Sequence, residues 1–324
     1  ERHFKSLKQL TFSWSNAEAY FSPDGTKLIY QGHPQGGCDH MFMMNIDGSQ
    51  QRLISENGGR NTCGFFVNDG TVVYSSTSEA GRDCPKEHDR SKGYVWDAFS
   101  SYEIFRSRTD GLNLKNITNT KGYDAESTVC NGKIAFTSAR SGDSLHIYTM
   151  NVDGSDVKKL TTKAGYNGGP FFSKDCQQIV YRAYHPESKA DIAKFKKAVR
   201  EGYIPPGNLE IYVMNADGSA KRQITNLGTA SFAPSFYPDK KQVIFSSPGK
   251  TTAEPGTEKQ RRPFQLWSVK AAGTLQTELE TITTEGSFNG FPMFSPDGKF
   301  LVFASNRNSS NPHELQVFIA EWQD

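Results

Sequence analysis

The sequence Phe-Ser-Pro-Asp-Gly occurs twice, at residues 21–25 and 294–298, and alternating aliphatic and aromatic residues follow each copy. An apolar run that enters Ser-Pro-Asp-Gly and leaves through such an alternation predicts two antiparallel strands joined by a tight turn. Proline presets one turn dihedral, and glycine accepts a positive φ. The repeat therefore predicts a β-hairpin near each end of the chain.

Degenerate copies of this hairpin begin at Phe65, Val129, Phe171 and Phe236, which makes six units. A third strand and a short polar fourth strand follow each hairpin, and we call the four strands A to D in chain order. Repeats of four antiparallel strands predict an all-β fold, a β-propeller with one blade per repeat. We expect a single domain, 1–324, whose blades span 16–55, 60–118, 123–161, 166–225, 229–283 and 288–322.

The last unit runs out after its third strand, whereas residues 5–12 form an orphan strand at the N-terminus. Pairing the two completes blade six and removes the exposed edges that an open sheet would carry. We therefore expect an N-terminal strand to close a six-bladed ring.

Composition limits the kinds of partner and of cellular compartment that we expect for the protein. The net charge of +2 gives no indication of a nucleic-acid partner, and no apolar run is long enough for a membrane span. The chain begins at Glu1 rather than Met, which favours a processed secretory protein. Five cysteines fit an oxidising compartment with two disulfides and one spare thiol.

The Ser-Pro-Asp-Gly hairpins, the Met-Asn-x-Asp-Gly-Ser turns and the Leu-Thr strand ends resemble the PD40 (WD40-like) repeats of TolB-like propellers. The likeness covers nearly the whole chain and is closest to secreted single-propeller proteins of this type. It implies a six-bladed propeller located in the periplasm or outside the cell.

The loops between strands B and C are long in three units, at 79–101, 185–208 and 248–263. In a propeller these loops and the connections from strand D to the next strand A emerge on one face, which we call the B–C face. Long insertions on one face are where binding residues usually lie. The second insertion begins with a capping pattern at Ser188 and predicts a short helix. In the first, Tyr94 and Trp96 either anchor the loop to the blade or stack on a ligand.

Small polar residues recur at the start of every strand A: Asn16, Asn61, Asp124, Asn167, Ser231 and Asn289. Two positions later stand Glu18 and Glu126. We predict that these residues either cap the local turns or line the mouth of the central channel as a ligand-binding funnel. In the second case Glu18, Asp124 and Glu126 form an acidic wall suited to a Ca²⁺ or Mg²⁺ ion.

Five histidines, His33, His40, His88, His185 and His313, lie in or beside B–C loops. Some PD40-type propellers are metal-assisted polysaccharide lyases with histidine ligands in the channel, and this resemblance supplies an enzymatic alternative. Arg140, Arg182 and Arg307 follow strand B at similar places, where they either bind the carboxylates of a uronic acid or form ion pairs between blades.

Cysteine positions predict one disulfide on the B–C face. Cys38 and Cys84 lie in the B–C loops of adjacent blades, with Cys63 between them, and we favour the bridge Cys38–Cys84. Cys130 and Cys176 occupy A–B hairpins, where equivalent points of neighbouring blades risk exceeding the Cα separation that a disulfide allows.

The sequence thus favours a secreted or periplasmic, non-enzymatic propeller that binds a protein, glycan or peptide through its B–C face and channel mouth, with no nucleic acid as partner. The first alternative is a metal-assisted polysaccharide lyase. The second is a structural subunit of an extracellular assembly. Propellers serve as scaffolds and as enzymes, so the fold alone does not choose between them.

Overall fold

The computed structural model describes residues 1–91, 93–250, 262–273, 275 and 279–323. Each Ser-Pro-Asp-Gly repeat forms a tight turn, and the Asp24 carboxylate holds the first one. It accepts hydrogen bonds from the Ser22 hydroxyl (2.6 Å) and the Thr26 amide (3.0 Å). Gly25 lies at φ 72°, the left-handed region that glycine tolerates best. Asp297 repeats the contact with Ser295 at 2.7 Å in the last hairpin.

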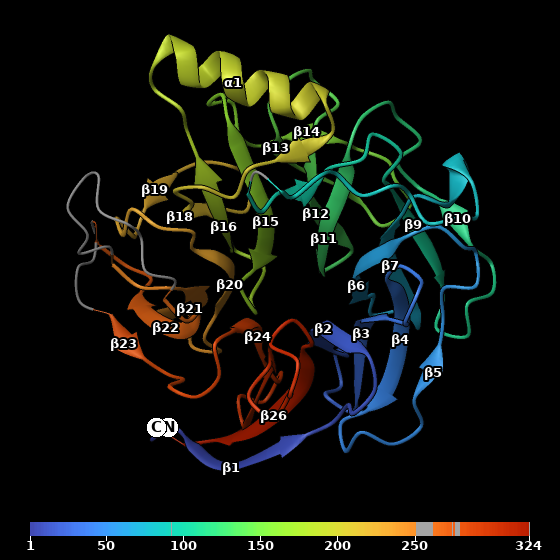
Figure 1. Ribbon diagram of the computed structural model, residues 1–324, viewed down its shortest axis with the longest axis vertical. Coiled ribbons are helices and arrows are strands. Elements are labelled where there is room, and N and C mark those ends of the chain that lie inside the picture. The colour runs from blue at the N-terminus through green and yellow to red at the C-terminus, as the bar shows by residue number, and fades with distance from the viewer. Residues whose placement is uncertain (92, 251–261, 274, 276–278, 324) are drawn as a thin grey trace.

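The strands form six four-stranded antiparallel sheets around a central axis (Figure 1). Blade one contains β2 (Ser15–Phe21), β3 (Lys27–His33), β4 (His40–Asn45) and β5 (Arg52–Leu53). Blade two contains β6 (Asn61–Phe66), β7 (Thr71–Ser76), β9 (Glu103–Arg108) and β10 (Lys115–Asn116). Blade three contains β11 (Asp124–Cys130), β12 (Lys133–Ser138), β13 (His146–Asn151) and β14 (Lys158–Lys159).

The other three blades repeat this order. Blade four contains β15 (Tyr166–Phe172), β16 (Gln178–Tyr184), β18 (Glu210–Asn215) and β19 (Arg222–Gln223). Blade five contains β20 (Phe232–Phe236), β21 (Gln242–Ser247), β22 (Gln265–Lys270) and β23 (Glu280–Thr281). Blade six contains β24 (Asn289–Phe294), β25 (Phe300–Ser305), β26 (Gln316–Trp322) and β1 (Phe4–Gln9).

The N-terminal strand β1 pairs with β26, so the two ends of the chain lie together in one blade (Figure 1). This confirms the predicted six-bladed ring and the way it closes. The hydrophobic core lies between neighbouring blades. Leu28 of blade one, for example, packs in one cluster with Val302 and Val317 of blade six. Each blade therefore buries its faces mainly against its neighbours, as expected for a repeat fold.

Insertions on the B–C face add the remaining elements. A short 3₁₀ helix, η1 (Ser78–Ala80), begins the blade-two insertion, and α1 (Lys189–Arg200) lies in the blade-four insertion. Ser188 caps α1 by accepting a hydrogen bond from the Asp191 amide, which confirms the predicted helix start. The blade-five insertion lies largely outside the described residues. In the described part of the chain, no helix is long and apolar enough to span a membrane.

The blade-two and blade-four insertions meet each other. β8 (Trp96–Asp97) pairs with β17 (Tyr203–Ile204) in a two-stranded sheet. Phe195 of α1, Ile204 and Ala98 then pack in one cluster with Tyr123 and Leu145 of blade three and its flanks. The two insertions therefore cover blade three.

Candidate functional site

The six small polar residues at the start of the innermost strands are buried, with at most 4% of their surface exposed. Five of these side chains form hydrogen bonds with the connection that precedes their blade, whereas the Ser231 hydroxyl bonds to the Ser247 hydroxyl of its own blade. Asn16 Nδ2 donates to the Ser13 carbonyl at 2.6 Å, Asn167 Nδ2 to the Lys163 carbonyl at 3.0 Å, and Asn289 Nδ2 to the Glu285 carbonyl at 2.8 Å. These contacts hold the turns, so this ring does not form an open funnel.

The residues two positions further along line the channel instead. Every innermost strand contains a register shift at this point. A β-bulge bends the strand and redirects a side chain. The six residues at the bulges have φ angles of 48–58°, which is uncommon for residues other than glycine. They surround a cavity of about 60 Å³ in the channel: Glu18, Cys63, Glu126, Gly169, Ala233 and Phe291.

Aromatic rings narrow the channel on both sides of this cavity. Tyr20, Phe65 and Phe171 follow the bulges, and their ring centroids lie 5.7 Å from one another. Tyr20 and Phe171 belong to blades one and four, so their contact crosses the channel. On the B–C side, Trp96 lies 6.1 Å from the Phe232 ring of blade five. The blade-two insertion therefore extends over the channel mouth.

Glu126 is held by three groups. Its carboxylate forms an ion pair with Arg182 and accepts hydrogen bonds from the Tyr166 hydroxyl (2.9 Å) and the Gly169 amide (3.0 Å). Arg182 stacks at 4.8 Å from the Trp96 ring. A Cβ at Gly169 would lie 2.1 Å from the Arg182 guanidinium, which explains the small residue at this bulge. Glu126 thus belongs to a rigid network of ion pair and hydrogen bonds.

The predicted acidic wall is divided in the structure. Asp124 is fully buried away from the cavity, where it binds the Arg140 guanidinium (2.9 Å) and the Thr120 hydroxyl (2.6 Å). Glu18 and Glu126 line the cavity without it. Among the residues that the structure describes, no three His, Cys, Asp or Glu side chains are grouped to hold a metal ion. The arrangement does not fit the predicted Ca²⁺ site of Glu18, Asp124 and Glu126.

Glu18 is the channel carboxylate with the most perturbed acidity. Burial raises the pKa of Glu18 to about 7, a hydrogen bond with the Cys63 thiol opposes this, and the charge of Glu126 adds to it. Burial, Glu18 and Glu126 likewise raise the pKa of the Cys63 thiol. Near neutral pH the cavity therefore contains a carboxyl group that is partly protonated beside a thiol that keeps its proton.

The variant Glu18→Gln tests this electrostatic state. The pKa of Glu18 rises from an ordinary 4.5 to about 7 on folding, so the folded protein binds the extra proton and loses stability as the pH increases between these values. Glutamine removes this loss. We expect the stability difference, variant minus wild type, to be larger at pH 8 than at pH 5 by up to about 3 kcal/mol in urea unfolding.

The exposed residue Glu56 supplies the control for that experiment. Glu56→Gln removes a carboxyl group outside the channel, and its stability difference is measured at the same two pH values. An equal response of the two variants would contradict the assignment of a raised pKa to Glu18.

The histidines of the B–C face are separate from one another in their contacts. His185 Nε2 lies 2.9 Å from Asn167 Oδ1, and burial, with Lys163 and His146 adding to it, lowers the pKa of His185 to about 4. His88 lies between Asp97 Oδ1 (2.7 Å) and the Glu201 carbonyl (2.8 Å). Both nitrogens of His88 and Nε2 of His185 are thus occupied by local hydrogen bonds, whereas His40 Nδ1 is buried without a partner in the described part of the chain.

Most of the predicted rim residues point inward. Arg140 binds Asp124, Arg182 binds Glu126, and Arg307 donates to Asn289 Oδ1 at 3.0 Å. Trp96 covers Arg182. Tyr94 remains on the surface with 66% of it exposed, and the Arg90 guanidinium lies 5.6 Å from its ring.

Two disulfides join neighbouring blades, each with a Cα separation of 5.7 Å. Cys38–Cys84 ties the B–C loops of blades one and two, and Cys130–Cys176 ties the A–B hairpins of blades three and four. The expected difficulty in bridging those hairpins is therefore wrong, because their turns approach closely enough. Two disulfides indicate an oxidising compartment.

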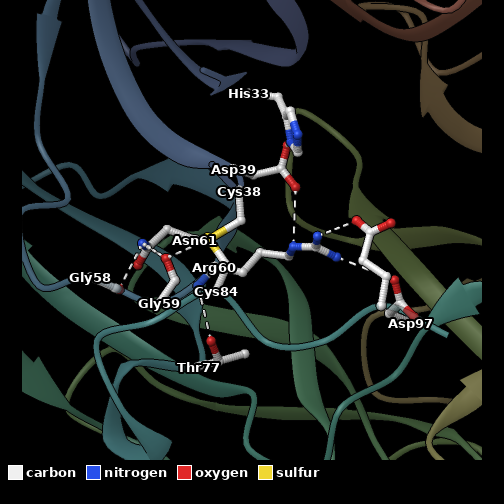
Figure 2. The surroundings of a disulfide bond; sticks show 11 residues. His33, Cys38, Asp39, Gly58, Gly59, Arg60, Asn61, Thr77, Cys84 and Asp97 are labelled. Atoms are coloured by element: carbon white, nitrogen blue, oxygen red, sulfur yellow. Dashed lines mark hydrogen bonds and ion pairs between the residues drawn. A yellow bond between two sulfur atoms is a disulfide. The ribbon is translucent and has the colours of Figure 1, made fainter. Parts of the chain in front are cut away.

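The Cys38–Cys84 bridge adjoins a cluster of charges (Figure 2). Asp39, the residue after Cys38, faces both the His33 ring (3.3 Å) and Arg60 Nε (3.5 Å). The Arg60 guanidinium also reaches Asp97 of β8 at 3.3 Å. The disulfide and these ion pairs fasten the first insertion to blade one.

Sequence reasoning missed a larger cavity of about 350 Å³ beside blade one. It lies between the connection from blade six and the side of blade one, and Phe12 and Trp14 on that connection are 75% and 47% exposed. The signal was present as two aromatic residues in a turn. The residues that line it are Thr11, Phe12, Ser13, Trp14, Asn16, Tyr30, Phe42, Gln51, Arg52 and Leu53.

No family model matches the chain. The uncharacterized peptidase YuxL of Bacillus subtilis is 26% identical over 188 residues, which are 57% of this chain and 22% of YuxL. The Tol-Pal system protein TolB of Francisella tularensis is 25% identical over 221 residues, which are 67% of this chain and 43% of TolB. The chain thus matches less than half the length of either relative.

Solved propellers with other chemistries share the fold. The putative TolB from Agrobacterium tumefaciens has a TM-score of 0.60 at 16% identity, over 98% of this chain and 97% of its own. The gluconolactonase XC5397 from Xanthomonas campestris has a TM-score of 0.63 at 12% identity, over 99% and 91%. An oligogalacturonate lyase in complex with manganese has a TM-score of 0.52 at 11% identity, over 99% and 95%. The repeats, the closed ring and these relatives together show that the chain is a TolB-like six-bladed β-propeller.

Proposed function

We propose that this protein is a non-enzymatic binding propeller of an oxidising compartment, which takes a protein, peptide or glycan partner on its B–C face. The observation that carries the proposal is the cross-linking of the insertions on that face. Cys38–Cys84 joins the loops of blades one and two, and the β8–β17 pair joins the insertions of blades two and four. A surface fixed in advance loses little conformational entropy on binding, which favours affinity.

The polar side chains of the channel support binding over catalysis. Glu126 and Asp124 are engaged by arginines, and the His185 ring is engaged by Asn167. Catalytic acids and bases need access to the substrate proton that they transfer. Trp96 covers the channel on the B–C side, so a polymer has no direct approach to Glu18.

The second candidate function is that of a metal-assisted lyase. The structural likeness to an oligogalacturonate lyase is the reason to test it. The protein is incubated with polygalacturonate and with Mn²⁺ or Ca²⁺, and unsaturated products are followed by their absorbance near 235 nm. We expect no product from the wild type. A metal-dependent product that His185→Ala abolishes would overturn the proposal.

Binding on the B–C face is tested with arrays of tethered glycans and of random peptides. Tyr94→Ser removes the exposed ring of the blade-two insertion. Val157→Ser is the matched control, because Val157 is also an exposed apolar residue (42%) but lies in the turn between strands C and D of blade three, on the opposite face. We expect wild-type array signals to fall in Tyr94→Ser and to persist in Val157→Ser. Signals that both variants retain would contradict the assigned face.

A further inference from the structure

Stacked or tilted aromatic pairs recur along the ring, with one residue from strand B and one from strand C. In blade one Tyr30 and Phe42 lie 5.6 Å apart. The separations are 6.5 Å in blade two, 5.9 Å in blade three, 5.4 Å in blade four and 5.9 Å in blade six. The same flat apolar surface is therefore built five times.

In blades three and six an arginine covers this surface. The Arg140 guanidinium lies 5.0 Å from the Phe136 ring and donates to Asp124 Oδ2 at 2.9 Å. The Arg307 guanidinium lies 5.0 Å from the Phe303 ring, donates to Asn289 Oδ1 at 3.0 Å and forms an ion pair with Glu1 at 2.7 Å. Each guanidinium thus joins an aromatic pair to the polar residue that begins strand A of the same blade.

Blades four and two place other planar nitrogen groups there. His185 packs 5.5 Å from the Tyr212 ring, with Nε2 at 2.9 Å from Asn167 Oδ1. In blade two the Asn57 amide donates to Asn61 Oδ1 at 3.2 Å and accepts from the tyrosine hydroxyl of the aromatic pair at 3.1 Å. In four blades, then, a planar nitrogen group of the chain itself fills this place.

Blade one has the aromatic pair and the polar residue Asn16, but no planar nitrogen group of the described chain joins them. Lys27 of blade one and Lys133 of blade three occupy equivalent positions, because they pair with Asn45 and Asn151 at the ends of their C strands. Pro34 and Arg140 each follow seven residues later, so Pro34 of blade one takes the position of Arg140 of blade three. Asn16 is 4% exposed, and its Nδ2 donates to Ser13 and Gln316. No group in the described part of the chain donates to Asn16 Oδ1. Asn16 lines the cavity of about 350 Å³, so a ligand in the cavity can reach this oxygen.

Four aromatic residues line the cavity together with polar side chains and Arg52, and no carboxylate is among the lining residues. Trp14 lies 6.2 Å from Phe42 and adopts φ 62°, which is rare for a bulky residue. Gln316 Nε2 holds this conformation by donating to the Trp14 carbonyl at 2.6 Å. The Arg52 guanidinium does not lie on the aromatic pair of blade one. Arg52 pairs with Met43 in the sheet and its guanidinium contacts Met43 Sδ at 3.6 Å, whereas Leu53 is the residue that pairs with Phe42.

We propose that the cavity beside blade one is a binding site for a guanidinium group, supplied by an arginine side chain of a partner peptide. The guanidinium stacks on Tyr30 and Phe42 and donates to Asn16 Oδ1, as Arg140 and Arg307 do within their own blades. The cavity volume of about 350 Å³ accommodates the aliphatic stem of the arginine as well. This site lies beside the connection from blade six, away from the cross-linked insertions that carry the proposed function, and does not depend on them.

The test titrates the protein with N-acetyl-arginine amide, N-acetyl-lysine amide and N-acetyl-citrulline amide, using calorimetry and NMR. We expect the arginine compound to bind roughly tenfold more tightly than the others, because only it combines a planar donor with a cation. The variant Pro34→Arg supplies the guanidinium from the chain itself and should abolish binding. Pro34→Ala, the matched control, should retain it.

Equal affinity for the arginine and lysine compounds would overturn the inference. Undiminished binding of the arginine compound by a Pro34→Arg variant that folds as stably as the wild type would also overturn it. Trp14→Ala gives an independent readout, since it removes one wall of the cavity and should weaken arginine binding without altering the lysine result. Tyr94→Ser should leave arginine binding unchanged. Array signals that depend on Tyr94, together with no binding of the arginine compound by the wild type, would support the B–C face while this inference fails.

Discussion

The variant Arg182→Met is expected to lower the free energy of unfolding by about 3–5 kcal/mol, because it leaves the Glu126 carboxylate without its counter-ion in a buried place. The side chains of Arg182 and Glu126 are only 11% and 13% exposed. The Tyr166 hydroxyl and the Gly169 amide remain as partners of Glu126, but they carry no full charge. Urea unfolding at pH 7 measures the loss.

The control for this prediction is Arg108→Met, which removes an arginine from an exposed ion pair with Asp110. We expect that variant to change the free energy of unfolding by less than about 1 kcal/mol. The double variant Arg182→Met/Glu126→Gln should recover part of the loss, because glutamine needs no counter-ion. Equal effects of Arg182→Met and Arg108→Met would show that the channel pair contributes nothing beyond a surface pair.

Removing the Cys130–Cys176 bridge with Cys130→Ser/Cys176→Ser is expected to cost about 2–4 kcal/mol of unfolding free energy. The bridge spans 46 residues, for which the loss of chain entropy in the unfolded state corresponds to about 4 kcal/mol. Thermal or denaturant unfolding under non-reducing conditions measures it.

The other bridge provides a matched comparison, since Cys38 and Cys84 are also 46 residues apart. If each disulfide stabilises the protein only by lowering the chain entropy of the unfolded state, the two double variants lose the same free energy of unfolding. We expect Cys38→Ser/Cys84→Ser to lose more, because it also loosens Asp39 from Arg60. Cys63→Ser keeps both bridges and is the thiol control. Unchanged stability in both double variants would contradict a stabilising role for the disulfides.

Much of the fold was predictable from short-range patterns. Ser22, Asp24 and Gly25 determine their turn through contacts within five residues, so the hairpin is visible in the sequence. Repetition of that unit indicated six blades, and the unpaired fourth strand indicated how the ring closes. The capping residue Ser188 marked the start of α1 for the same local reason.

The candidate site was predicted only in part. The positions of Asn16 and Glu18 on strand A were correctly aligned between blades, but the sequence does not show a bulge. A regular strand turns alternate residues to the same side, and the left-handed residue at each bulge breaks that alternation. For this reason Glu18 lines the channel, whereas Asn16 is buried against its turn.

By itself the sequence determined the repeat, the number of blades and the closing strand, because each rests on contacts within a hairpin or on simple counting. Tertiary structure alone decided which charges meet: Asp124 with Arg140, Glu126 with Arg182, and Asp39 with Arg60. It also decided that blade one, with Pro34 in place of an arginine, has no planar nitrogen group of the described chain on its aromatic pair. Such contacts depend on the twist and spacing of whole blades, and residues far apart in the chain meet only after the ring has closed.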